Sequence, residues 1–104
     1  METMRVLVGK IQDLPEGTQK SVRVGRQSVL VVNHQNQFYA LRNMCTHESV
    51  ALEGGRLEEG QITCEAHGAR FELATGKATK MPAVKAVRLY KAIVDGEDLY
   101  VEEL

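Results

Sequence analysis

Two cysteine–histidine pairs are the residues of this sequence best suited to chemistry. One residue separates Cys45 from His47, two residues separate Cys64 from His67, and sixteen residues lie between the pairs. Together they hold both cysteines of the chain and two of its three histidines. Thiolates and imidazoles bind transition metals. A cysteine followed so closely by a histidine predicts a metal site rather than a disulfide.

Two alternatives to a redox metal centre stay open from the residue types alone. A structural zinc ion accepts two cysteines and two histidines, although zinc modules usually pair like with like along the chain. Without any metal, a buried cysteine is a small apolar residue and a loop histidine is a solvated side chain. The occurrence of two such pairs at this spacing argues against the metal-free alternative.

The two motifs resemble the signature of Rieske proteins, C-x-H followed by C-x-x-H at about this spacing. The resemblance continues through residues 64–76, CEAHGARFELATG, where the family commonly shows His-Gly, an aromatic residue and Thr-Gly. It implies one [2Fe–2S] cluster per chain, with two thiolates on one iron and two imidazoles on the other. The ligands implied are Cys45, His47, Cys64 and His67.

Four positions near these motifs depart from the high-potential members of that family. Those members carry an extra disulfide, but Val50 and Ala66 occupy the matching positions here. They also carry a serine and a tyrosine whose hydroxyls donate to cluster sulfur, where this chain has Ala69 and Phe71. Such hydrogen bonds stabilise the reduced state. The departures therefore predict a low-potential centre, as in the ferredoxins of bacterial ring-hydroxylating oxygenase systems.

The resemblance implies a one-electron carrier between a flavin-dependent reductase and a terminal oxygenase. The alternative is a small Rieske subunit of a larger oxidoreductase, such as assimilatory nitrite reductase. An oxygenase itself would need a second iron, typically held by two histidines and a carboxylate. Only His34 is left for that site, in a polar turn where we expect it to be solvated. The sequence therefore predicts an electron-transfer component rather than an enzyme.

The elements that position these motifs are expected to be β-strands, because short runs of Val, Leu, Ile and Tyr alternate with polar residues. No segment has a convincing helical period. We expect a single domain over residues 1–104, an all-β antiparallel sandwich or incomplete barrel, with a cluster-binding subdomain inserted at about residues 44–76. The strands expected are Arg5–Val8, Ser21–Val24, Ser28–Val32, Phe38–Leu41, Arg56–Leu57, Gln61–Cys64, Arg70–Glu72, Val84–Val94 and Leu99–Glu102. Val84–Val94 is expected as one long strand or as a strand with a bend.

Composition excludes several other classes. The formal net charge is −1, with no basic run of the kind that binds nucleic acid. No apolar run is long enough to span a bilayer, and Met1–Lys10 lacks a secretory pattern. We expect a cytoplasmic monomer with transient partners. Glu48 and Glu65 lie beside the two motif histidines, either as solvated side chains or as an acidic docking rim for a basic partner.

Overall fold

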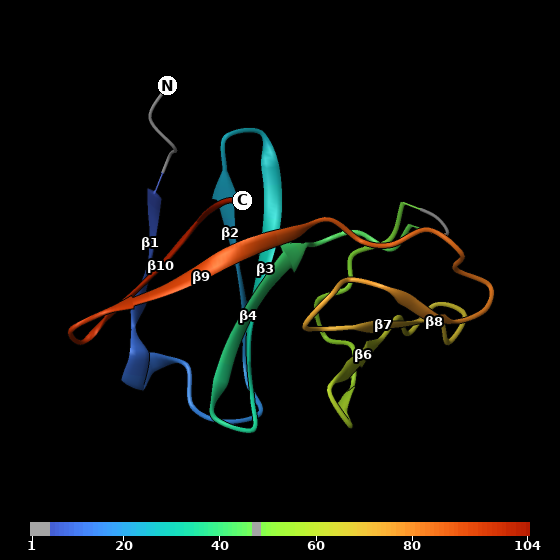
Figure 1. Ribbon diagram of the computed structural model, residues 1–104, viewed down its shortest axis with the longest axis horizontal. Helices are drawn as coiled ribbons and strands as arrows, with labels where there is room; N and C mark the ends of the chain where they lie inside the picture. Colours follow the sequence, from blue (N-terminus) through green and yellow to red (C-terminus); the bar gives the residue numbers. More distant parts are fainter. Residues whose placement is uncertain (1–4, 47–48) are drawn as a thin grey trace.

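The computed structural model describes residues 5–46 and 49–104, and this part of the chain is built almost entirely from β-strands (Figure 1). The elements described are β1 (Arg5–Lys10), η1 (a 3₁₀ helix, Ile11–Asp13), β2 (Gln19–Val24), β3 (Gln27–His34), β4 (Gln37–Arg42), β5 (Leu57–Glu58), β6 (Gln61–Thr63), β7 (Arg70–Glu72), β8 (Ala78–Lys80), β9 (Leu89–Asp95) and β10 (Asp98–Glu103). The all-β class expected from the sequence is confirmed. No helix in these ranges is long and apolar enough to cross a membrane.

Six of the strands form one antiparallel sheet in the order β1-β10-β9-β4-β3-β2. The sheet curls until its two edge strands, β1 and β2, approach each other. Lys20 on β2 spans the remaining gap, because its Nζ donates a hydrogen bond to the carbonyl of Val8 on β1 at 2.9 Å. The result is a nearly closed barrel, which confirms the incomplete barrel predicted from the sequence.

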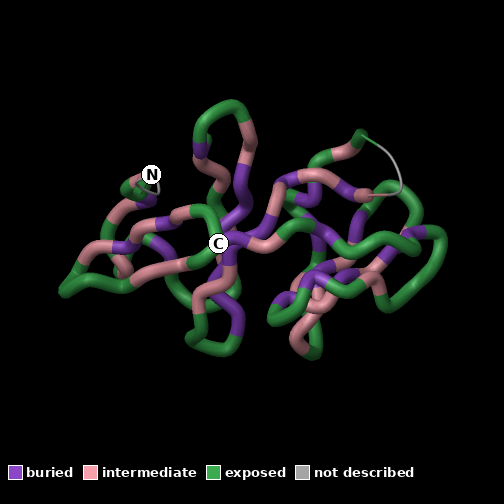
Figure 2. Tube along the Cα trace, turned by 45° about the horizontal axis from the view of Figure 1, so that its top comes forward, coloured by how far each residue is buried: buried purple, intermediate pink, exposed green. Residues whose placement is uncertain are grey.

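The other four strands form a small antiparallel sheet in the order β5-β6-β7-β8. In the chain, these strands lie between β4 and β9, which are neighbours in the barrel. Figure 1 shows the small sheet beside the barrel, at the right of the view. We call the segment that joins β4 to β9, residues 43–88, the insertion. Buried chain segments run through both the barrel and the insertion (Figure 2).

Strand β3 belongs to the cores of both regions. Its run Val29-Leu30-Val31-Val32 is fully buried. Successive side chains of a strand point to opposite faces. Val29 and Val31 therefore pack inside the barrel, while Leu30 and Val32 pack against the insertion. A strand covered on both faces loses its polar alternation, which explains the continuous apolar run.

The two cores differ in composition. The barrel core consists of Val8, Leu14, Val24, Val29, Val31, Ala40, Tyr90, Leu99 and Val101. The core shared with the insertion consists of Leu30, Val32, Leu41, Cys45, Leu52, Ile62, Cys64, Ala69, Phe71, Leu73, Ala83 and Val87. Both cysteines therefore lie in the second core.

The strand predicted over Val84–Val94 is wrong in its first half, since β9 begins only at Leu89. The backbone of the segment before β9 forms hydrogen bonds with loops instead of with a neighbouring strand. The Lys85 carbonyl accepts from Thr46 Oγ1 at 2.7 Å, and the Val87 amide donates to the Gly76 carbonyl at 2.8 Å. Strand β8 and helix η1 were not predicted, although the equally short strand β7 was.

Candidate metal centre

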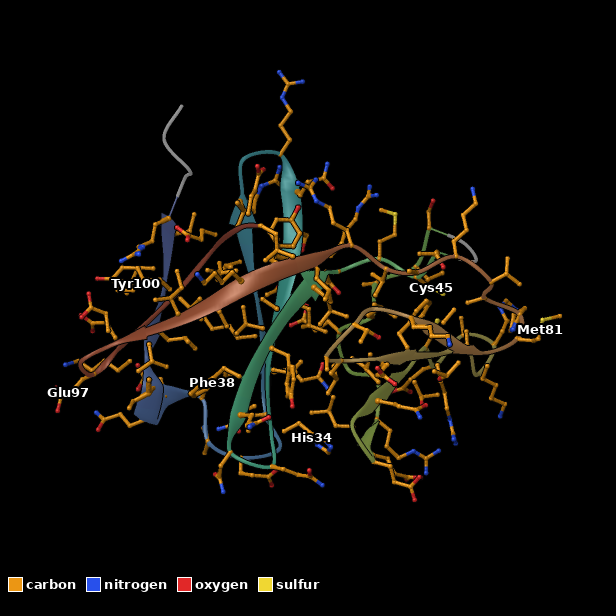
Figure 3. The ribbon with its side chains drawn as sticks, viewed as in Figure 1. His34, Phe38, Cys45, Met81, Glu97 and Tyr100 are labelled. Atoms are coloured by element: carbon orange, nitrogen blue, oxygen red, sulfur yellow. The ribbon has the colours of Figure 1, made fainter. Side chains whose placement is uncertain are left out.

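The two cysteines lie in loops that directly follow barrel and insertion strands. Cys45 comes three residues after the end of β4, and Cys64 comes immediately after β6. Their exposed fractions are 2% and 1%, and both belong to the core shared with the insertion. Figure 3 shows Cys45 beyond the end of β4, on the side of the molecule that also carries Met81. The structure thus brings the two predicted thiol ligands into one buried cluster.

The second motif forms a tight loop that exposes its histidine. The Cys64 amide donates to the Ala69 carbonyl at 2.7 Å, and the Gly68 amide donates back to the Cys64 carbonyl at 2.8 Å. Closing the loop requires a positive φ of 77° at Gly68, which a glycine adopts without strain. His67 stands at the exposed side of this loop while Cys64 is buried. One motif therefore presents a thiol inward and an imidazole outward.

The first motif is described only in part, because His47 lies outside the described residues. The Cys45 amide donates to the Val50 carbonyl at 2.8 Å. Thr46 Oγ1 donates to the Lys85 carbonyl at 2.7 Å, so the segment that leads into β9 lies against this loop. The loop is thus held both by its own backbone and by a segment about forty residues later in the chain.

The two ligand loops are joined to each other at the Gly54-Gly55 turn. The Thr63 amide, next to Cys64, donates to the Arg56 carbonyl at 3.0 Å. A side chain on Gly55 would collide with the Thr63 carbonyl, so only glycine allows this approach. The turn therefore couples the end of the first loop to the residue that precedes the second cysteine.

One barrel side chain binds that turn with both ends of its amide. Gln19 on β2 donates from Nε2 to the Gly55 carbonyl at 2.6 Å, and its Oε1 accepts from the Gly54 amide at 2.9 Å. Asn43, just after β4, adds a third bond, since its Oδ1 accepts from the Glu53 amide at 2.9 Å. Sequence reasoning missed Gln19 and Asn43. The paired glycines were the only local signal that something approaches this turn closely.

His34 corrects a prediction, since it is not solvated. It ends β3 with only 7% of its surface exposed, and its Nε2 accepts from the Gly60 amide at 2.9 Å. Gly60 lies in the turn between β5 and β6, and β6 leads directly to Cys64. Figure 3 shows His34 on the side of the barrel that faces the small sheet. The third histidine thus fastens the insertion to the barrel.

The residues around the cysteines suit an iron–sulfur centre of the two-plus-two kind. Ala69 and Phe71, where high-potential Rieske proteins place hydroxyl donors, are both fully buried next to the thiols in the shared core. No three His, Cys, Asp or Glu side chains are grouped around one point within residues 5–46 and 49–104. In a Rieske centre, each iron is bound by only two protein ligands. The described donors are two buried thiols and one exposed imidazole, which are the ligand types that a Rieske cluster uses.

Two clefts that differ in charge flank the cysteines. The cleft beside Cys64 is lined by Arg56, Thr63, Cys64, Glu65 and Gly68, so it carries one charge of each sign. The cleft beside Cys45 is lined by Arg42, Met44, Cys45, Thr46, Ser49, Lys85, Ala86, Val87 and Arg88. Among these described lining residues, three are cationic and none bears a carboxylate.

Comparisons with known proteins agree with this geometry. The profile of the Rieske [2Fe-2S] domain matches residues 4–91. The ferredoxin component of biphenyl 2,3-dioxygenase from Rhodococcus jostii (strain RHA1) is 33% identical over 90 residues, which cover 86% of this chain and 84% of that protein.

Solved structures show the same similarity over the whole chain. The ferredoxin of carbazole 1,9a-dioxygenase from Nocardioides aromaticivorans IC177 has a TM-score of 0.88 at 31% identity, covering 100% of both chains. A chain in the complex of reduced oxygenase and oxidized ferredoxin in carbazole 1,9a-dioxygenase has a TM-score of 0.90 at 29% identity, covering 97% of this chain and 94% of that chain.

Proposed function

This chain belongs to the Rieske [2Fe-2S] family, and from that membership we propose that it binds one Rieske cluster and carries single electrons to a terminal oxygenase. The burial of both motif thiols in one core is the observation that supports this function best. When bound, such a cluster accepts and returns one electron. The protein is an electron-transfer component, like the ferredoxin components that it resembles, and not an enzyme.

We propose Cys45, His47, Cys64 and His67 as the cluster ligands. The buried thiolates would hold the inner iron, away from water. The exposed imidazole of His67 would hold the outer iron at the surface, where a partner protein can approach. The assignment of His47 rests on the sequence motif, because this residue lies outside the described residues.

The residues near the thiols favour a low reduction potential. Neither Ala69 nor Phe71 has a hydroxyl that could donate a hydrogen bond to a cluster sulfur. We therefore expect a midpoint nearer about −150 mV than about +300 mV, the two ends of the Rieske range. A redox titration followed by visible circular dichroism measures it. A midpoint above zero would contradict the expected effect of these two side chains.

We propose two transient partners for the carrier. The acceptor is an oxygenase, as in the oxygenase–ferredoxin complex to which this chain is similar. The donor is a flavin-dependent reductase, which the resemblance to oxygenase ferredoxins implies. A free carrier purifies alone, whereas a fixed subunit of a larger oxidoreductase co-purifies with its partner in constant ratio. The cytoplasmic location and monomeric state expected above belong to this proposal.

Metal and sulfide analysis of the purified protein tests the cluster directly. We expect two irons and two acid-labile sulfides per chain, together with a Rieske-type electron paramagnetic resonance signal after reduction. His67→Cys should alter or abolish that signal, because the outer iron would lose an imidazole. One equivalent of zinc with no visible absorption would refute the proposal.

A further inference from the structure

The cleft beside Cys45 has a charge that the proposed electron-carrier function does not explain. We call it the basic cleft, after its three cations, Arg42, Lys85 and Arg88. They come from the end of β4 and from the segment just before β9. Because Cys45 and Thr46 also line the cleft, it opens onto the first ligand loop.

Two hydrogen bonds join the segments that carry these cations, which lie far apart along the chain. The Arg42 amide donates to the Arg88 carbonyl at 2.8 Å, which holds the end of β4 against the start of β9. The Lys85 carbonyl accepts from Thr46 Oγ1 at 2.7 Å, which places that lysine beside the ligand loop. The fold therefore holds the backbone segments that carry the three cations beside one another.

The positive charge of the cleft is only partly neutralised. Arg88 contacts Glu103 at 3.9 Å through half-exposed side chains, and such surface pairs are weak. No ion pair of Arg42 or Lys85 is found within the described ranges. The Arg42 Nε is buried and lacks a hydrogen-bond partner there. Lys85 and Arg88 are exposed in the cleft, so carboxylates of a ligand can reach them.

We propose that the basic cleft is a docking site for an acidic segment of the oxygenase that receives the electron. The proposal rests on the proposed function, since it names the chemistry of the partner at the same end of the molecule. An acidic segment seated in the cleft would lie against Thr46 and Ser49, which also line it, so docking would bring the partner to the first ligand loop.

This assignment is opposite in charge to one of two interpretations of the sequence. Glu48 and Glu65 were interpreted either as solvated side chains or as an acidic rim for a basic partner. Glu65 shares its cleft with Arg56, so its charge is opposed there, and Glu48 lies outside the described residues. The larger unopposed charge described beside a cysteine is positive. Complementary charge of this kind steers association and weakens as salt screens it.

The proposal is tested with the cluster-loaded protein and a labelled polyglutamate peptide, whose binding is followed by fluorescence anisotropy. The variant is Lys85→Glu. The matched control is Lys10→Glu, which makes the same change of net charge at the end of β1, next to Glu97. At low ionic strength we expect Lys85→Glu to weaken peptide binding about fivefold or more, as reversal of one close charge should. Lys10→Glu should leave the affinity unchanged.

Several outcomes would overturn the docking site. Equal affinity of the Lys85→Glu variant and the parent would do so, as would equal weakening by Lys10→Glu, because the effect would then come from net charge alone. Displacement of the peptide by inorganic phosphate, beyond the effect of chloride at equal ionic strength, would identify a small-anion site instead. Peptide binding does not depend on electron transfer. Failure of the docking site is therefore distinguishable from failure of the carrier function, which metal analysis reports.

Discussion

The barrel and the insertion are stabilised in different ways. Barrel strands run for six to eight residues, whereas the four strands of the insertion run for two or three. The barrel core is aliphatic apart from Tyr90, while the core shared with the insertion contains two thiols. Strands this short gain little from their own ladders. The insertion therefore depends on contacts with the barrel and, in the proposed function, on a bound cluster.

This difference shows how the barrel, as a rigid scaffold, positions the loops of the insertion. Two barrel residues, Gln19 and His34, bond to the backbone of the insertion, and Asn43 at its start bonds to the Glu53 amide. The chain thus separates two tasks. The barrel folds through regular ladders and apolar burial, and it then orients loops whose thiols serve chemistry as well as packing.

Among the variants considered, loss of one thiol should produce the largest difference in stability between the barrel and the insertion. Cys64→Ser removes a proposed ligand, and metal binding contributes folding free energy where the site is not preformed. We expect complete loss of iron and sulfide, with faster amide exchange across residues 57–80 and little change in β2 and β3. Hydrogen exchange with mass spectrometry measures the exchange, and metal analysis measures the loss. Full iron and sulfide content in this variant would remove Cys64 from the ligand set.

A cavity in the shared core and a cavity in the barrel core should change the order in which cluster absorbance and secondary structure are lost during unfolding. Phe71→Ala in the shared core should cost about 3–5 kcal/mol, and Leu99→Ala in the barrel core about 2–5 kcal/mol. Because the barrel positions the insertion, Leu99→Ala should abolish cluster absorbance and far-ultraviolet circular dichroism together during denaturation. Phe71→Ala should lose the absorbance first. Coincident transitions in both variants would show that the two regions unfold as one unit.

Removal of the two hydrogen bonds between the Gln19 amide and the Gly54-Gly55 turn should destabilise the cluster-binding loops by an intermediate amount. Gln19→Leu removes two hydrogen bonds to backbone groups, each worth about 0.5–1.5 kcal/mol net. We expect the cluster to bleach several-fold faster in the presence of an iron chelator. The control is Gln12→Leu on the exposed 3₁₀ helix, which should bleach at the parent rate. Equal rates for all three proteins would assign no positioning role to Gln19.

The smallest of these effects is expected at His34. His34→Phe keeps an aromatic ring but removes one acceptor, so it should lower the free energy of unfolding by about 0.5–1.5 kcal/mol. Amide exchange measured by nuclear magnetic resonance should speed up at Gly60. The Gly17 amide is an internal control. It donates to the carbonyl of Asn33, the residue before His34, and does not bond to the His34 side chain. If Gly60 keeps its protection, His34 does not fasten the insertion.

Local patterns were enough to predict much of the fold. Apart from β9, the predicted barrel strands agree with the observed ones to within two residues at each end, including the strand predicted over Ser28–Val32. The pattern failed over residues 84–88, where the alternating apolar residues suggested a continuous strand. That segment bonds to the first ligand loop and to Gly76, and neither partner is visible from neighbouring residues.

The sequence by itself determined the chemistry that this protein can offer. Cys45, His47, Cys64 and His67 are donors by residue type, and their spacing within each motif is local. The lack of hydroxyls at Ala69 and Phe71 is equally local. These features depend on no distant residue, so the order of amino acids is enough to interpret them.

Only the tertiary structure decided how those donors are held and what surrounds them. Gln19 reaches a turn that lies 35 and 36 positions later, and His34 reaches an amide 26 positions later. The basic cleft likewise joins the end of β4 to the start of β9. Sequence patterns report neighbours along the chain, whereas these contacts depend on how the barrel closes and where it places the insertion. The fold therefore decides the support of the proposed centre and the charge that a partner meets.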